Sequence, residues 1–258
     1  MDLNNQTIVT CKIIKKEKLT EASYKKLIQE ASLEISDNFI PKNLAFIEQE
    51  QFCFLIKEFI EGEPLDQYLE SKRKRLRKKF APHFFEKAFE LIQKVHRSGY
   101  IHCDIKPSNF IVDENLNLHL IDFGLTQKNG NFIYGKTLFS MGFSPTEIIL
   151  NHTSLVSEKS DYFNLGICLW YLFSLEIPLR HEHPAYMINL QITHPIPNHS
   201  KIPKKWFSII EEICVKPSFP IPPNQMKKEE RMNLIQAAID DRPDEKRMLE
   251  LIRSAQQI

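Results

Sequence analysis

Glycine is scarce in this chain, and none of it lies near the start. Only 7 of the 258 residues are glycine, and the first of them is Gly62. A backbone that closely approaches a phosphate usually needs glycine, because a Cβ would hold the two apart. A Gly-rich loop that covers phosphates is therefore excluded between residues 1 and 61.

Charge of one sign and long apolar runs are lacking as well. The 34 Lys and Arg residues nearly balance the 33 Asp and Glu residues, so the net charge of +1 indicates no nucleic-acid or acidic partner. Asn164, Ser174 and Glu176 interrupt the most apolar run, residues 163–179, which predicts a buried helix rather than a membrane span. The N-terminus has no basic stretch followed by an apolar one, so we expect no signal peptide.

The cysteines form no C-x-x-C pair. Five are scattered along the chain, at positions 11, 53, 103, 168 and 214. This spacing favours a reducing compartment and argues against a zinc site. We therefore expect a cytoplasmic protein.

The densest set of chemically active residues lies between residues 99 and 126. The segments HCDIKPSN (residues 102–109) and DFG (residues 122–124) flank a stretch that predicts a strand, a polar turn and a second strand. Such a hairpin would return Asp122 close to Asn109. Two acids and an amide beside a lysine suit a cation and a phosphate, since Mg²⁺ prefers one or two carboxylates plus phosphate oxygens.

This pattern resembles the catalytic loop and metal-binding segment of the eukaryotic-type protein kinases. By that resemblance Asp104 would accept the substrate hydroxyl proton, and Lys106 would contact the transferring phosphate. Asn109 and Asp122 would hold Mg²⁺. A lysine two places after the aspartate, followed by proline, is typical of the Ser/Thr branch. Cys103 stands where the family most often has arginine.

The first fifty residues predict the lysine–glutamate pair of that family. Residues 7–14 are rich in β-branched side chains and predict a strand. The segment VTCK (residues 9–12) resembles the family's V-A-I-K strand, so Lys12 would pair the ATP phosphates. A helix expected to begin near Thr20 carries Glu30, the favoured partner of Lys12, although Glu34 one turn further on stays open. The predicted buried face of this helix comprises Tyr24, Leu27, Ile28, Ala31 and Ile35.

A β-hairpin is predicted next, from residues 46–47 and 52–60. By the resemblance, residues 58–60 form the hinge, where the backbone of Glu58 and Ile60 would hydrogen-bond adenine. Lys57 would then lie at the rear of the pocket, a position that is normally neutral. It could compete with Lys12 for the helix glutamate, unless the register is off by one.

The second half of the chain carries further resemblances. Ser140 falls where the family usually has a threonine that touches the catalytic aspartate. Asp161 matches the acid that braces the catalytic loop, and Arg242 looks like the arginine that pairs with Glu147. The basic run KRKRLRKK (residues 72–79) could contact nucleic acid, anionic lipid or an import receptor, or be a solvated loop. A helix is predicted after it, with the apolar face Phe84, Phe85, Ala88, Leu91, Ile92 and Val95.

The resemblance implies an α+β, two-lobed protein-kinase-like fold in a single domain. Its β-rich N-lobe, truncated at its start, would comprise about residues 1–60, and its mainly helical C-lobe about residues 61–258. The expected function is phosphorylation of Ser or Thr hydroxyls of a protein substrate by a monomer, with ATP and Mg²⁺. Apart from the basic run, no nucleic-acid or membrane partner is indicated. The alternatives are a pseudokinase that acts as a binding module, a small-molecule kinase on the same fold, and a chain whose true start lies upstream of Met1.

Overall fold

The N-terminal part of the molecule contains a three-stranded antiparallel sheet. The computed structural model describes residues 7–130 and 138–258. The strands are β1 (Val9–Lys15), β2 (Asn43–Glu48) and β3 (Phe52–Glu58), in the order β1-β3-β2. Along β3, Cys53, Leu55 and Lys57 are buried and alternate with half-buried neighbours, as expected for a sheet covered on one face. The predicted first strand and hairpin are confirmed, although β3 ends at Glu58.

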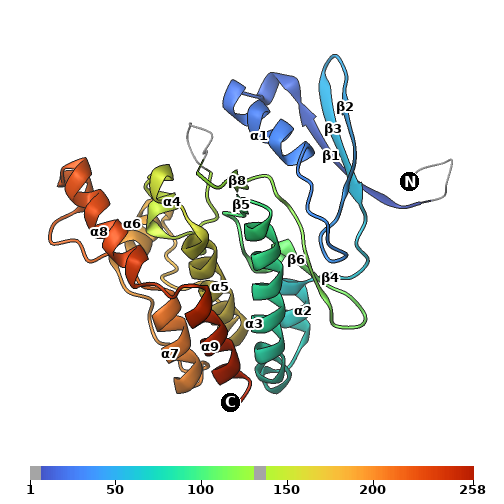
Figure 1. Cartoon of the computed structure of the whole chain (residues 1–258). Coiled ribbons are helices and arrows are strands. Elements are labelled where there is room, and N and C mark those ends of the chain that lie inside the picture. The colour runs from blue at the N-terminus through green and yellow to red at the C-terminus, as the bar shows by residue number, and fades with distance from the viewer. Residues whose placement is uncertain (1–6, 131–137) are drawn as a thin grey trace.

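Helix α1 (Glu21–Ala31) covers that face of the sheet (Figure 1). Its N-cap is Thr20, as predicted, and the Thr20 hydroxyl accepts a hydrogen bond from the Ser23 amide at 3.2 Å. The buried residue Leu27 clusters with Cys53 and Leu55 of the sheet. This contact fixes the side of the helix that faces the strands.

The predicted buried face of α1 is wrong at two positions. Ile28 is 37% exposed, and Ile35 is buried but lies beyond the end of the helix. The helix ends at Ala31, and the Asn43 side chain stabilises this end by capping its last carbonyl groups. Asn43 Nδ2 donates to the carbonyl oxygens of Glu30 at 2.6 Å and Ala31 at 3.1 Å, and the Glu30 carbonyl oxygen also accepts from the Leu33 amide at 3.3 Å.

The remainder of the molecule is mainly helical and surrounds a buried helix, α5. The α-helices of this part are α2 (Leu65–Ser71), α3 (Lys74–Arg97), α4 (Thr146–Ile149), α5 (Glu158–Ser174), α6 (Pro184–Thr193), α7 (Lys204–Ile213), α8 (Lys228–Asp241) and α9 (Glu245–Ala255). Helix α5 is buried along nearly its whole length and packs between α3 and α7 (Figure 1). The predicted buried helix is thus confirmed up to Ser174. Leu175 ends it with a left-handed φ of 59°.

Helix α3 confirms one prediction and corrects another, the expected loop at the basic run. Its predicted apolar residues are all buried, and Gly99 follows its end with a φ of 82°. The basic run is no loop, because α3 begins at Lys74. Within the run Arg77 is buried and donates to the Lys72 carbonyl oxygen at 2.7 Å. Among the described helices none is long and apolar enough to cross a membrane.

Two small sheets lie where the N-terminal sheet meets the helical part. Strands β4 (Glu63–Pro64), β6 (Phe110–Val112) and β7 (Leu118–Leu120) pair in the order β4-β6-β7, and β5 (Tyr100–Ile101) pairs with β8 (Gln127–Lys128). The β6–β7 pair confirms the predicted strand, turn and strand. The molecule thus has an α+β fold with a small β-rich lobe and a larger helical lobe. We propose a lobe boundary near residue 60, because β3 ends at Glu58 while β4 already pairs with β6.

Candidate active site

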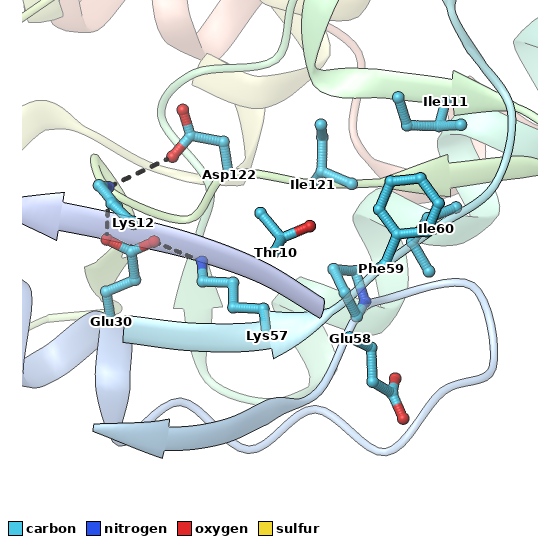
Figure 2. A pocket seen from close by; sticks show the side chains of 11 residues that line it. Thr10, Lys12, Glu30, Lys57, Glu58, Phe59, Ile60, Ile111, Ile121 and Asp122 are labelled. Atoms are coloured by element: carbon cyan, nitrogen blue, oxygen red, sulfur yellow. Dashed lines mark hydrogen bonds and ion pairs between the residues drawn. The ribbon is translucent and has the colours of Figure 1, made fainter. Parts of the chain in front are cut away.

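A cavity of about 410 Å³ lies between the three-stranded sheet and the β6–β7 hairpin. Its walls come from β1, α1, the end of β3, β6 and the segment after β7 (Figure 2). All five residues expected to contact the nucleotide line it, namely Lys12, Glu30, Glu58, Ile60 and Asp122. Sequence reasoning missed other lining residues, among them Thr10, Pro41, Ile111 and Ile121.

An ion-paired cluster occupies one end of the cavity. Lys12 Nζ lies 2.9 Å from Glu30 Oε2 and 3.7 Å from Asp122 Oδ1 (Figure 2). This geometry confirms the Lys12–Glu30 contact, whereas Glu34 is exposed at the surface. The absence of a side chain at Gly124 leaves room for the ammonium, since a Cβ there would lie 2.9 Å from Nζ.

The charges of this cluster reinforce one another. Burial alone would lower the pKa of Lys12, but the carboxylates of Glu30 and Asp122 outweigh it and raise the pKa above its ordinary value. Burial likewise opposes ionisation of Asp122, yet Lys12 and the Gly124 amide hold the pKa of its carboxyl below the ordinary value. Lys12 is therefore cationic and Asp122 anionic at neutral pH.

Lys57 is also part of this cluster. Its ammonium lies 2.5 Å from Glu30 Oε1, so Lys57 and Lys12 share one carboxylate, one on each oxygen. The sequence predicts that the two lysines could compete for Glu30. In the structure they share it, because each ammonium pairs with a different carboxylate oxygen. Figure 2 shows the Lys57 side chain directed at Glu30 and away from Phe59.

The end of β3 supplies the edge of the cavity predicted as the hinge. Glu58, Phe59 and Ile60 all line the cavity. The Glu58 amide already donates to the Lys42 carbonyl oxygen at 3.0 Å, and Glu58 Oε2 accepts from the Lys42 amide at 3.0 Å. The Glu58 amide is thus engaged within the protein. That the backbone here binds adenine stays a prediction.

A second polar cluster forms around Asp104, which is 4% exposed. Lys106 Nζ donates to Asp104 Oδ2 at 2.8 Å and to Ser140 Oγ at 2.9 Å. Ser140 Oγ in turn donates to Asp104 Oδ1. The predicted contact between residue 140 and this aspartate is therefore present.

Asn109 and Asp122 sit at the open end of the same hairpin. The Ile121 amide donates to the Asn109 carbonyl oxygen at 2.8 Å, which places Asn109 beside the strand that leads into Asp122. Asn109 Nδ2 donates to the Asp104 carbonyl oxygen at 2.8 Å and to Asp104 Oδ2 at 3.1 Å. Its amide oxygen is thus the atom left for a cation. One amide oxygen and one half-exposed carboxylate fit the ligand preference of Mg²⁺, which keeps waters and phosphate oxygens as its other ligands.

Asp161 holds the backbone of the Asp104 loop. It is fully buried and accepts from the amides of His102 and Cys103, both at 2.8 Å, and its Oδ2 lies 2.8 Å from His96 Nε2. These bonds keep Cys103 in a left-handed conformation, with a φ of 64°, which costs a non-glycine residue free energy. The predicted bracing is confirmed as a contact. Cys103 is itself buried, which raises the pKa of its thiol well above the ordinary value.

The predicted pair between Glu147 and Arg242 is present and fully buried. Arg242 donates Nη1 to Glu147 Oε1 at 2.6 Å and Nη2 to Oε2 at 3.0 Å. Ser160 Oγ donates to Glu147 Oε1 at 2.8 Å. This network ties α4 to α5 and to the end of α8.

A two-lobed α+β fold that has one polar cluster at the end of its cavity and a second polar cluster around Asp104 defines a phosphotransferase-type site. The chain belongs to the protein kinase family, whose protein kinase domain matches residues 1–250. Serine/threonine-protein kinase F of Synechocystis sp. is 33% identical over 131 residues, which cover 49% of this chain and 26% of that protein. Maternal embryonic leucine zipper kinase of Xenopus laevis is 30% identical over 174 residues, which cover 66% of this chain and 26% of that protein.

A plant relative aligns over more of the chain. CBL-interacting protein kinase 10 of Oryza sativa subsp. japonica is 25% identical over 196 residues, which cover 72% of this chain and 42% of that protein. The aligned parts thus span between about a quarter and two fifths of the length of these relatives.

Proposed function

We propose that the chain transfers the γ-phosphate of ATP to Ser or Thr hydroxyls of a protein substrate. The observation that carries this proposal is the Asp104–Lys106–Ser140 cluster, a buried carboxylate held by an ammonium and a hydroxyl. The relatives named serine/threonine-protein kinases support the choice of acceptor. Lys106 followed by proline supports it as well.

Asp104 orients the acceptor hydroxyl and accepts its proton as the oxygen attacks phosphorus. Lys106, already within 2.8 Å of Asp104, offsets the negative charge of the transferring group. A hydroxyl substrate would take over the place of Ser140 Oγ on the carboxylate. These residues perform positioning and charge neutralisation, which is most of what phosphoryl transfer requires of a protein.

ATP and Mg²⁺ are the cofactors that this site would take. Asn109 and Asp122 would hold Mg²⁺, which supplies charge neutralisation at the phosphate oxygens. Lys12, oriented by Glu30, would contact the phosphates, and the backbone of Glu58 and Ile60 would meet the adenine ring. Residues 1–61 contain no glycine that could bring backbone amides close to the phosphates, so among these residues side-chain cations would carry more of the phosphate binding.

We further propose that the protein acts as a cytoplasmic monomer on a protein substrate. All five cysteines are free thiols, which agrees with a reducing compartment. The basic run at the start of α3 leaves a nucleic-acid or membrane partner open.

One alternative has an observation in its favour. A pseudokinase that binds partners without turnover would tolerate both the lack of glycine before residue 62 and the buried Lys57. The Asp104 cluster favours the active enzyme, because a binding module has no need for it.

The experiment is a phosphate-transfer assay with γ-labelled ATP, Mg²⁺ and a panel of generic protein acceptors. Wild type should label an acceptor, and Asp104→Asn should lose this turnover while still binding Mg–ATP by calorimetry. A wild type that binds Mg–ATP but labels no acceptor would establish the pseudokinase alternative instead.

A further inference from the structure

Two lysines from different strands meet on the carboxylate of Glu30. Lys12 comes from β1 and binds Oε2, whereas Lys57 comes from β3 and binds Oε1 (Figure 2). Strand β3 is the central strand of the sheet, paired on both sides, whereas β1 lies at its edge. Lys57 is therefore attached to the stiffer of the two supports.

The two lysines differ sharply in their access to water. The Lys12 side chain is 39% exposed, the Lys57 side chain 10% and the Glu30 side chain 2%. If Lys12 turns away, water can follow it to Oε2. If Lys57 is lost, Oε1 remains in a site that water does not reach, and an unpaired buried carboxylate is strongly unfavourable.

Other contacts hold α1 without any help from Lys12. Asn43 Nδ2 donates to the Glu30 carbonyl oxygen at 2.6 Å. Gln29 Nε2 donates to the Thr126 carbonyl oxygen at 2.7 Å, which links α1 to the segment after Asp122. With Lys57 on the Glu30 carboxylate, the helix is fixed to both lobes while the Lys12 contact stays dispensable.

We propose that Lys57 is the positioning residue of this site: it holds Glu30, and through it α1, so that Lys12 is not the sole support of the helix and can share its ammonium with the phosphate oxygens. A single lysine would have to serve both purposes, and the pull of the phosphates would weaken its hold on the helix. Here the two tasks fall to different residues. The inference has two halves. The anchoring half states that Lys57 holds Glu30, and it does not depend on the proposed function. The phosphate half states that this lets Lys12 share its ammonium with the phosphates, and it rests on the proposed function.

Hydrogen exchange of the ligand-free protein tests the anchoring half, with Lys12→Met as the matched control for Lys57→Met. Amides in residues 27–31 should exchange about tenfold faster or more in Lys57→Met, because losing one partner of a buried pair is far more costly than losing an exposed one. Lys12→Met should change them less than about threefold. Unchanged exchange in Lys57→Met, or equal acceleration in both variants, would overturn the proposal.

Removing the charge on Glu30 distinguishes anchoring by the Lys57–Glu30 ion pair from a role of Lys57 in packing alone. In a Glu30→Gln background, Lys57→Met should accelerate exchange by less than about twofold, because no buried charge is left unpaired. With Glu30 unchanged, Lys57→Arg keeps the cation and should restore the protection of these amides from exchange. If Lys57→Met fails to fold, the double variant should still fold; failure of both, or a full effect in the Glu30→Gln background, would refute the inference.

The phosphate half is read out by calorimetric titration with Mg–ATP. The Kd should rise about tenfold or more in Lys57→Met, in which Lys12 must balance the charge of Glu30 without Lys57, and return to within about threefold in Lys57→Arg. An unchanged Kd in Lys57→Met would overturn this half. Failure of wild type itself to bind Mg–ATP would instead refute the proposed function and leave the exchange result standing.

Discussion

Substitution of Arg242 by methionine measures how much stability depends on one buried ion pair. Arg242 and Glu147 are both 0% exposed in their side chains, and Arg242 Nε also donates to the Val215 carbonyl oxygen at 3.0 Å. Methionine keeps much of the volume and removes every one of these donors. Among the described residues, the Glu147 carboxylate would keep only the Ser160 hydroxyl as a partner.

The expected loss is large because the remaining carboxylate stays buried. Breaking a buried pair from one side costs about 3 to 5 kcal/mol, against a total stability of about 5 to 15 kcal/mol for a typical domain. With a urea m-value of about 2 to 3 kcal/mol/M, the unfolding midpoint should fall by about 1 to 2.5 M. Urea denaturation followed by circular dichroism is the assay. If the two lobes unfold in separate steps, the midpoint of the helical lobe is the one to compare between the variant and wild type.

The chain offers a matched control for this experiment. Arg247 pairs with Glu212 in the same two-pronged geometry, at 2.6 and 3.1 Å, but both side chains are substantially exposed. Arg247→Met should leave the midpoint almost unchanged, because water replaces the lost partner. Arg242→Met combined with Glu147→Gln should recover much of the loss. Equal midpoints for Arg242→Met and Arg247→Met would refute the reasoning.

The remaining predictions concern the site and the thiols. Asp122→Ala should abolish both Mg²⁺-dependent ATP binding and turnover in calorimetry and phosphate-transfer assays, and retained binding would contradict the assigned role. The pKa of Asp122 is lowered from 3.8, so the stability it contributes is present above about pH 4 and is lost as pH falls through the folded-state pKa. In Asp122→Asn the melting temperature should therefore decrease less steeply below about pH 4 than in wild type. An identical decrease in both proteins would refute this. Ellman's reagent should modify about one thiol of the native protein, exposed Cys11, and five after unfolding; fast native labelling of buried Cys103 would contradict the packing.

The parts of the site that the sequence predicts well are those encoded by short spacings. Asp104, Lys106 and Asn109 lie within one loop, and the hairpin that follows fixes where Asp122 returns. The partners Glu147 and Arg242 lie 95 residues apart, and only their order along the chain, matched to a family, could predict the contact.

Features set by tertiary contacts were not predictable from periodicity. The pattern of apolar residues extends α1 to Ile35, but the helix ends at Ala31, where capping by the Asn43 side chain from a neighbouring strand stabilises its end. The same limit applies to Lys57. Its position suggests competition for Glu30, whereas the proposal that Lys57 anchors the carboxylate rests on the exposure of each lysine, which the sequence does not give.

The most direct test of the central claim is phosphoamino-acid analysis after incubation with γ-labelled ATP, Mg²⁺ and a protein acceptor. The account predicts label on serine or threonine with wild type and none above background with Asp104→Asn. Label that persists at full level in Asp104→Asn, or its absence from both residues in wild type, would contradict it.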